Sequence, residues 1–285
     1  MAREYIVELP THSVGVLEWG PADGEPLIAL HGFPDTAWTW RKVAPLLAEQ
    51  GYRVAAPFLR GYAPSGMPGD YSVRALAADA VALHERLGGT ALIGHDWGAI
   101  IATTLAGDPA NPYPRVAALA VPPLGLMNPT RATLRPWLGA MLRQPRKSWY
   151  IAYHQLPGRS ERHFERLVRR LWNDWSPGYD ATEDIDHLTR AIPDRAHASA
   201  AIGYYRERDF RPAFAAPRTP LLYLHGARDG ALDRRYFAVA APHLTPPSRA
   251  ALIPDAGHFL HLERPEAVAG LLVDWLRTSP HESGM

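Results

Sequence analysis

Residues 94–98 read Gly-His-Asp-Trp-Gly and lie between an apolar stretch and a stretch with helical spacing. The stretch before them, Thr90–Gly94, predicts a buried strand, and the stretch after them, Trp97–Ala106, predicts a helix. Glycines on both sides permit a sharp strand-to-helix turn, which lifts the Asp96 side chain out of the sheet edge. An ordinary glycine-rich turn with an aspartate cap gives the same five residues, so other segments must decide whether Asp96 is a nucleophile.

Short apolar runs alternate with helix-period segments on both sides of this turn. The predicted strands are Tyr5–Leu9, Ser13–Trp19, Leu27–Leu30, Tyr52–Pro57, Arg115–Val121, Pro220–Leu224 and Ala250–Ile253. The predicted helices are Trp40–Gln50, Ser72–Leu87, Asp233–Ala240 and Pro265–Arg277. This alternation is typical of an α/β fold, in which helices flank a mostly parallel sheet.

The alternation stops between residues 122 and 217. This segment contains no convincing strand pattern and is rich in tryptophan, tyrosine, arginine and helix-forming residues. A helical insertion between two halves of one sheet explains the interruption better than two consecutive domains do. We therefore predict one core domain from residues 1–121 and 218–285, with residues 122–217 forming an inserted helical cap.

Composition narrows the class of protein. Of 285 residues 47% are hydrophobic and 21% charged, which is ordinary for a globular chain, and 30 basic against 29 acidic residues leave a net charge of +1. Nucleic-acid binding needs clustered positive charge, so we expect no nucleic-acid partner. The absence of cysteine excludes disulfides, thiolate nucleophiles and cysteine metal sites. No apolar stretch is long enough to predict a membrane span or a signal core, so we expect a cytoplasmic protein without a membrane partner.

Residues 31–34 read His-Gly-Phe-Pro and follow the predicted strand Leu27–Leu30. Backbone N–H groups of Phe33 and Trp97 could converge there on a developing negative oxygen, as in an oxyanion hole. A plain strand-to-helix turn with a buried His31 is the alternative interpretation.

A carboxylate and a histidine follow two of the later strands. Asp229 comes shortly after the strand Pro220–Leu224, and His258 follows the last predicted strand. The candidate nucleophile Asp96, the acid Asp229 and His258 then follow one another in the order expected of a fold whose nucleophile lies in a strand-to-helix turn. His261 is the nearest rival to His258, and Asp233 and Asp255 are weaker candidates for the acid.

Taken together, these motifs resemble those of the α/β-hydrolase superfamily, and specifically of its epoxide hydrolase branch. The resemblance covers nearly the whole chain and rests on residues 31–34, 60–62, 94–98 and 257–258. Ala63 stands where the family usually has a further glycine. The resemblance implies an eight-stranded, mostly parallel sheet with an inserted cap.

The resemblance also implies two cap tyrosines that hold the epoxide oxygen. Tyr150 and Tyr205 stand at the matching positions, and Tyr153 and Tyr204 are the fallback candidates if the register is wrong. The expected substrate-binding side chains are Phe33, Trp97, Trp149 and Tyr153. Most of the tyrosines must simply pack, and packing is the alternative for each of these.

The implied reaction uses no metal and no organic cofactor. Asp96 attacks a carbon of a small hydrophobic epoxide while Tyr150 and Tyr205 donate to the leaving oxygen. His258, oriented by Asp229, then activates water to hydrolyse the ester and release a vicinal diol. The sequence is also compatible with a homo-oligomer.

Two other functions remain open. A haloalkane dehalogenase would use the same carboxylates and histidine, with Trp97 and one of Trp149, Trp172 or Trp175 holding the halide, although many such enzymes carry asparagine where Phe33 stands here. A fluoroacetate dehalogenase is disfavoured because its elbow arginines correspond to Trp97 and Ile100. A relative that binds a small ligand without turnover would have no use for the complete catalytic set.

Overall fold

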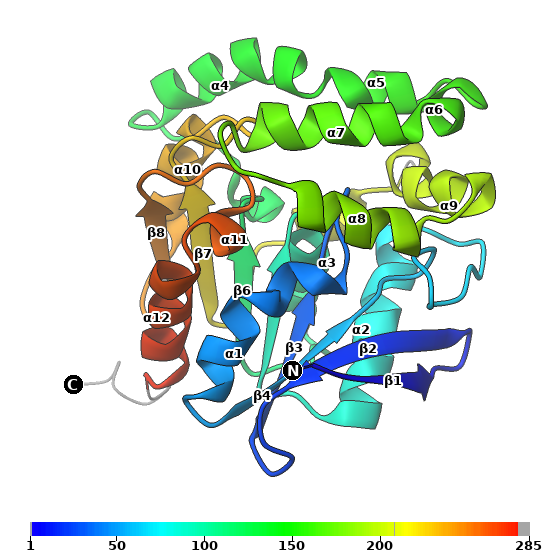
Figure 1. Ribbon diagram of the computed structural model, residues 1–285. Coiled ribbons are helices and arrows are strands. Elements are labelled where there is room, and N and C mark those ends of the chain that lie inside the picture. Colours follow the sequence, from blue (N-terminus) through cyan, green and yellow to red (C-terminus); the bar gives the residue numbers. More distant parts are fainter. Residues whose placement is uncertain (1, 208, 279–285) are drawn as a thin grey trace.

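The protein is described by a computed structural model that covers residues 2–207 and 209–278. Eight strands form one sheet in the order β1-β2-β4-β3-β5-β6-β7-β8 (Figure 1). β2 runs antiparallel to β1 and to β4, and the remaining neighbours are parallel. The strands are β1 (Arg3–Glu8), β2 (Ser13–Trp19), β3 (Glu25–Leu30), β4 (Tyr52–Pro57), β5 (Ala91–His95), β6 (Val116–Leu119), β7 (Leu221–Gly226) and β8 (Arg249–Ile253). The predicted fold class, a mostly parallel eight-stranded sheet, is confirmed.

Helices cover both faces of the sheet, so its central strands are buried along their whole length. α1 (Val43–Ala48) packs against α12 (Pro265–Leu276), and α2 (Val73–Leu87) packs against α3 (Trp97–Gly107). Every residue of β5, β6 and β7 is buried, as expected of parallel strands with helices on both sides. Short helices α10 (Arg235–Ala240) and α11 (Leu260–Glu263) follow β7 and β8 in the chain.

The predicted helix Trp40–Gln50 is wrong in detail. The chain forms a 3₁₀ turn, η1 (Ala37–Arg41), and then the separate helix α1. Pro45 has no N–H to donate to the carbonyl of Arg41, four residues earlier, and a proline is tolerated only in the first turn of a helix. The α-helix therefore starts again at Val43.

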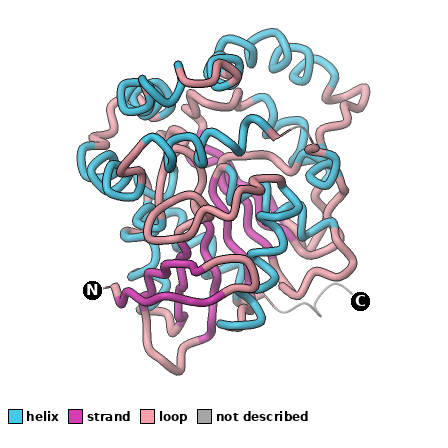
Figure 2. The backbone as a smooth tube through the Cα atoms, turned by 90° about the vertical axis from the view of Figure 1, so that its right-hand side faces the viewer, coloured by secondary structure: helices cyan, strands magenta, loops and turns pink. Residues whose placement is uncertain are grey.

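Between β6 and β7 the described residues form helices and loops without a strand. These cap helices are α4 (Leu134–Lys147), α5 (Trp149–His154), α6 (Arg159–Arg162), α7 (Phe164–Trp175), α8 (Thr182–Ala191) and α9 (Arg195–Arg206). The 3₁₀ turns η2 (Leu124–Leu126) and η3 (Arg211–Phe214) flank them, whereas η4 (Ala241–His243) follows α10 in the sheet domain. Figures 1 and 2 show them above the carboxyl ends of the parallel strands.

Specific contacts fasten the cap helices to the sheet domain. The indole N–H of Trp172 donates to the carbonyl of Pro34 at 2.9 Å, and the same indole stacks on Phe259 with centroids 3.5 Å apart. The Arg41 guanidinium pairs with the buried carboxylate of Asp184 on α8. These contacts hold the cap helices in a fixed position over the sheet domain. Within the described ranges, no helix has both the length and the apolar character needed to cross a bilayer.

Candidate active site

Asp96 lies in the sharp turn between β5 and α3. Its backbone has φ 51° and ψ −114°, a conformation that residues other than glycine rarely adopt. A Cβ atom added at Gly94 would collide with the carbonyl of Gly98, and one added at Gly98 would collide with the carbonyl of Leu30. Two glycines therefore let the helix start directly against the neighbouring strand, and this close packing holds Asp96 at the edge of the sheet.

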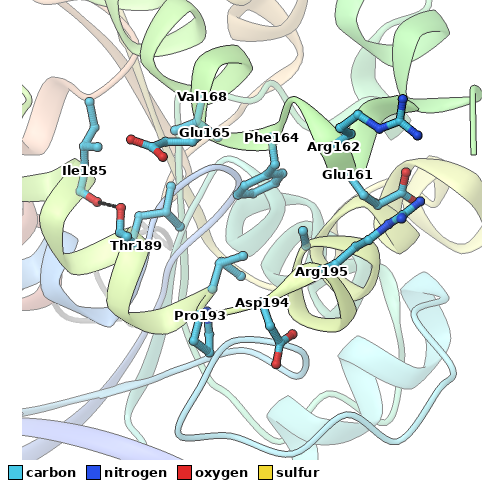
Figure 3. Close-up of a pocket in the computed structure, with 13 residues that line it drawn as sticks. Glu161, Arg162, Phe164, Glu165, Val168, Ile185, Thr189, Pro193, Asp194 and Arg195 are labelled. Atoms are coloured by element: carbon cyan, nitrogen blue, oxygen red, sulfur yellow. Dashed lines mark hydrogen bonds between the residues drawn. The ribbon is translucent and has the colours of Figure 1, made fainter. Parts of the chain in front are cut away.

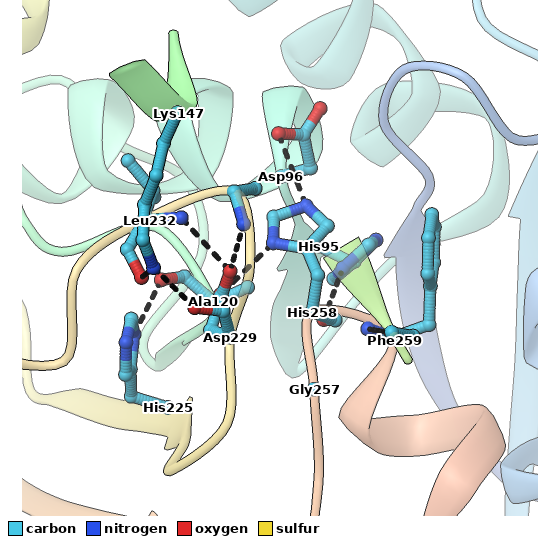
Figure 4. A network of polar contacts seen from close by, with 12 residues as sticks. His95, Asp96, Ala120, Lys147, His225, Asp229, Leu232, Gly257, His258 and Phe259 are labelled. Carbon is cyan, nitrogen blue, oxygen red and sulfur yellow. Dashed lines mark hydrogen bonds and ion pairs between the residues drawn. The ribbon is translucent and has the colours of Figure 1, made fainter. Parts of the chain in front are cut away.

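The structure brings the three candidate catalytic residues together. His258 Nε2 lies 3.5 Å from Asp96 Oδ2, and His258 Nδ1 lies 2.9 Å from Asp229 Oδ2 (Figure 4). All three side chains are buried. The Nδ1 contact fixes the ring and leaves Nε2 facing the nucleophile, which is the arrangement that a general base needs.

Backbone donors hold the acid. Asp229 Oδ1 accepts hydrogen bonds from the N–H groups of Ala231 at 2.7 Å and Leu232 at 2.8 Å. Lys147, the last residue of α4, donates from Nζ to the carbonyl of Asp229 at 2.6 Å (Figure 4). Lys147 was not singled out in the sequence, because no spacing rule connects the end of a cap helix to a loop after β7.

The two carboxylates decide the charge of His258. Burial alone would lower its pKa, but the charges of Asp229 and Asp96 and their hydrogen bonds raise that pKa to about 10. Burial likewise pushes the pKa of Asp229 upward, and the neighbouring His258 more than reverses this, so the pKa is lowered. The resting pair at neutral pH is therefore an imidazolium beside an ionised Asp229.

The expected oxyanion site has one donor in place. The N–H of Phe33 donates to Asp96 Oδ1 at 2.8 Å. A Cβ atom added at Gly32 would lie 2.5 Å from that oxygen and 2.7 Å from the backbone nitrogen of Trp97, so these groups border one small space. Because residue 32 is a glycine, the loop that carries Phe33 can approach the nucleophile this closely.

Two tyrosines from the cap helices lie beside this carboxylate. The rings of Tyr150 on α5 and Tyr205 on α9 pack edge to face with centroids 5.4 Å apart. Tyr205 also packs edge to face against Phe33 and Trp97, at 5.0 and 5.3 Å. Burial first, and the nearby charge of Asp96 in addition, raise the pKa of both phenols, with the Tyr150 phenol a further cause at Tyr205. Both hydroxyls therefore stay protonated at neutral pH and can donate.

The fallback tyrosines are directed elsewhere. The hydroxyl of Tyr204 is buried and donates to the carbonyl of Arg60 at 2.7 Å. The hydroxyl of Tyr153 lies 3.5 Å from the carbonyl of Arg159 on the outside of the cap. The buried hydroxyl of Tyr205, by contrast, has no hydrogen-bond partner among the described residues.

Of the expected substrate-binding residues, Phe33 and Trp97 lie at the site and two others do not. Trp149 and Tyr153 line a separate cavity of about 210 Å³ on the cap, and the Arg170 guanidinium lies 4.4 Å from the centre of the Trp149 ring. On α5 these two side chains leave the helix in other directions than Tyr150, which is buried. Sequence alone does not fix that helical phase.

The rival acids and histidine have other partners. Asp233 accepts from the N–H of Arg235 at 3.0 Å and forms an ion pair with its guanidinium. Asp255 pairs with Arg228 on the surface. His261 Nε2 is 2.5 Å from Thr39 Oγ1. The geometry thus selects Asp229 and His258 from the alternatives.

A second buried cluster, not anticipated from the sequence, lies behind His258. Potential ligand atoms of Asp35, His95 and His261 lie within 4.8 Å of one another, and His95 Nε2 is 3.0 Å from the carbonyl of His258. Such a donor set suits a divalent cation or one buried water. Burial, followed by the charge of Asp184, raises the pKa of Asp35 well above its usual range, and burial lowers the pKa of both histidines.

A larger cavity of about 370 Å³ lies among the cap helices (Figure 3). Its apolar side includes Phe164, Val168 and Ile185, and its polar rim includes Glu161. The Phe164 ring also packs edge to face against Phe33, with centroids 6.0 Å apart. One phenyl ring thus stands between this cavity and the residue that supplies the oxyanion donor.

Comparison with known proteins agrees with this geometry. The family model described as alpha/beta hydrolase fold matches residues 25–265. Epoxide hydrolase A of Mycobacterium tuberculosis is 29% identical, over 96% of this chain and 97% of that protein. The crystal structure of epoxide hydrolase A from Mycobacterium thermoresistibile superimposes with a TM-score of 0.75 at 28% identity, covering 97% of this chain and 98% of that one.

A haloalkane dehalogenase loop variant from Bradyrhizobium elkanii also superimposes, with a TM-score of 0.73 over 97% of this chain and 96% of that one. At 21% identity this likeness shows a shared fold. The family match spans both halves of the sheet and the helices between them, and relatives named epoxide hydrolases are similar over almost the whole length. The chain is therefore a hydrolase that belongs to the alpha/beta hydrolase fold family.

Proposed function

We propose that this protein hydrolyses epoxides to vicinal diols through a covalent ester on Asp96. The observation that carries the proposal is the packing of two cap tyrosines, Tyr150 and Tyr205, against each other. The Tyr205 ring also packs against Phe33, whose N–H donates to Asp96, and against Trp97, which follows Asp96 in the chain. An opening epoxide expels a strongly basic alkoxide, which needs a proton donor, whereas a halide does not. Relatives named epoxide hydrolases support the same conclusion.

In the first step a carboxylate oxygen of Asp96 attacks an epoxide carbon. Oδ1 is engaged by the N–H of Phe33, so Oδ2 is the oxygen left to attack. The carbon–oxygen bond of the ring breaks and its electron pair goes to the ring oxygen, which Tyr150 and Tyr205 stabilise by hydrogen bonding. The product of this step is an alkyl ester of Asp96 with a neighbouring hydroxyl.

Ester formation removes the negative charge of Asp96. Because that charge helps to hold a proton on His258, the pKa of His258 falls when the ester forms. The proton released by His258 balances the one that the alkoxide gains. Neutral His258 then takes a proton from water, and the resulting hydroxide attacks the carboxyl carbon of Asp96.

The second step regenerates the starting state. The carbonyl oxygen of the ester becomes the oxyanion, and the Phe33 N–H already donates to Asp96 Oδ1, the oxygen that takes this charge. Collapse of the tetrahedral intermediate breaks the acyl–oxygen bond, the proton of the added hydroxyl group passes to the departing oxygen, and the diol is released. Asp96 is again a carboxylate and His258 again an imidazolium, so the proton count closes over one cycle.

The test compares three tyrosine variants in pre-steady-state alkylation with a hydrophobic epoxide such as styrene oxide. Tyr150→Phe and Tyr205→Phe should each slow alkylation about 10- to 1000-fold, because each removes a donor to the leaving oxygen. Tyr204→Phe is the matched control. The Tyr204 hydroxyl donates to the carbonyl of Arg60, so its loss should change the alkylation rate little. Equal rates in all four proteins would overturn the tyrosine assignment.

A haloalkane substrate measured alongside separates the rival reaction. Trp172 is already committed to the carbonyl of Pro34, and Trp149 lies beneath Arg170, so neither indole is directed at Asp96. Trp175 does pack against His258 and Tyr150. Halide release without diol formation from epoxides would identify a dehalogenase and refute the proposal.

A further inference from the structure

The cap helix α4 presents a stripe of large apolar side chains to solvent. Leu142 is 81% exposed, and Leu138, Met141 and Leu134 are 47%, 46% and 44% exposed. Spacings of four, seven and eight residues place these four on one side of the helix. In Figure 1, α4 runs along the edge of the molecule furthest from the sheet. An apolar stripe in this position is a candidate contact surface.

Positive charge runs beside this stripe. Arg135, Arg143 and Arg146 are exposed on the adjoining side of α4, and none of them forms an ion pair with the residues that the structure describes. The sequence contains no Asp or Glu between Asp108 and Glu161. The net charge of the whole chain is only +1, so this basic region is a local feature that the balanced composition conceals.

The opposite side of α4 is fixed to the protein, which makes the outward orientation permanent. Ala140 is fully buried, and Gln144 donates to the carbonyl of Ala231 at 2.8 Å. Lys147 donates to the carbonyl of Asp229. The apolar stripe therefore cannot rotate inward, and solvent exposure of four large side chains persists in the isolated protein.

We propose that α4 is a membrane-contact helix that binds the surface of an anionic bilayer. Its apolar stripe, Leu134, Leu138, Met141 and Leu142, would enter the boundary between headgroups and acyl chains, and its arginines would lie among lipid phosphates. An apolar side flanked by arginine on a helix lying flat is the pattern of interfacial binding. The sequence expectation of no membrane partner considered only spanning segments, and interfacial binding requires none.

A second copy of the chain fits this surface less well. A symmetric dimer brings the same patch of both subunits together. Arg135, Arg143 and Arg146 would then face their own copies with no carboxylate from this segment to neutralise them, and like charges in contact are destabilising. Anionic phosphates supply the missing complement.

This surface is close to the proposed active site along the chain. α5, which carries Tyr150, follows α4 after Ser148. A bilayer-bound α4 would hold the cap against the phase in which hydrophobic substrates dissolve. The membrane proposal itself depends only on the exposed side chains of α4 and stands or falls independently of the reaction.

The test is flotation of the full-length protein with vesicles of phosphatidylcholine, with and without phosphatidylglycerol. We expect binding to the anionic vesicles that weakens as salt is added and weak or no binding to the zwitterionic ones. L138Q/L142Q should reduce the partition coefficient at least about 10-fold, because it removes two inserting leucines. R143Q/R146Q should reduce it about fivefold for each arginine removed.

Matched controls use exposed residues on elements other than α4. R74Q/R86Q removes two charges from α2, and Ile6→Ser removes an exposed apolar side chain from β1; neither should change binding. Circular dichroism checks that each variant is folded. Loss of binding in the controls, or binding that survives L138Q/L142Q, would contradict the proposal. A concentration-dependent dimer that L138Q/L142Q abolishes, without vesicle binding, would assign the surface to a second copy instead.

Discussion

Replacing Asp96 by asparagine should lower the pKa of His258. The amide keeps the size of the side chain and removes its charge, so Asp96→Asn reproduces the electrostatic state of the ester without forming it. Asp96 Oδ2 lies 3.5 Å from His258 Nε2 in a buried site. The variant thus isolates the charge effect on which the proposed proton cycle depends.

The expected size follows from that distance. Two unit charges 3.5 Å apart interact by about 5 kcal/mol at an effective dielectric constant of about 20. This sets an upper limit of roughly 3000-fold on the change in the acid dissociation constant of His258. Asp229 is closer, at 2.9 Å, and is the larger cause of the raised pKa, so we expect a change of at least about tenfold from Asp96→Asn.

The measurement is an NMR titration of histidine ring signals, with His258 assigned by its absence in His258→Gln. A second readout is stability. His258 has a raised pKa in the folded state, so it stabilises the protein fully below about pH 6.5, and that stabilisation disappears as the pH rises towards about 10. In Asp96→Asn the loss should be complete at a lower pH. An unchanged titration of His258 would refute the electrostatic reasoning, whatever the variant does to turnover.

Three further variants test separate parts of the site. His258→Gln should still form the ester but hydrolyse it at least about 100-fold more slowly, and mass spectrometry should find substrate attached to Asp96; free diol at the parental rate would exclude the two-step scheme. Gly32→Ala should lower kcat about 100-fold or more, because the new Cβ would lie 2.5 Å from Asp96 Oδ1. Full activity of this variant would mean that the loop after β3 can move aside. Lys147→Met should lower the free energy of unfolding by about 1.5–3 kcal/mol through loss of the bond to Asp229, as measured by urea denaturation, and Lys147→Arg should recover part of it.

The sequence predicted the parts of the site that local backbone geometry dictates. The turn at Asp96 needs glycine on both sides, and Asp229 and His258 stand where parallel strands end, so position along the chain implied position in space. The structure brings these groups within hydrogen-bonding range of one another. The same reasoning placed every sheet strand within two residues of its observed ends.

Features that depend on packing between distant segments were not predictable in this way. Trp149 was expected at the substrate and instead lines a separate cavity on the cap, because a one-residue change in helical phase turns a side chain by about 100°. The cluster of Asp35, His95 and His261 joins a loop, a strand and a helix that are distant in the sequence. The Lys147 side chain reaches a loop residue that lies 82 positions further along the chain. No local pattern encodes such pairings.

The origin of each half of the site along the chain has a wider consequence. The groups proposed to make and break the bond to Asp96 come from loops of the sheet, whereas the groups that would receive the departing atom come from one uninterrupted insertion between β6 and β7. Recombination that exchanged this single segment would leave Asp96, Asp229 and His258 themselves in place. A lineage could thereby acquire a new class of leaving group in one genetic event, which suggests how closely related scaffolds come to cleave chemically different bonds.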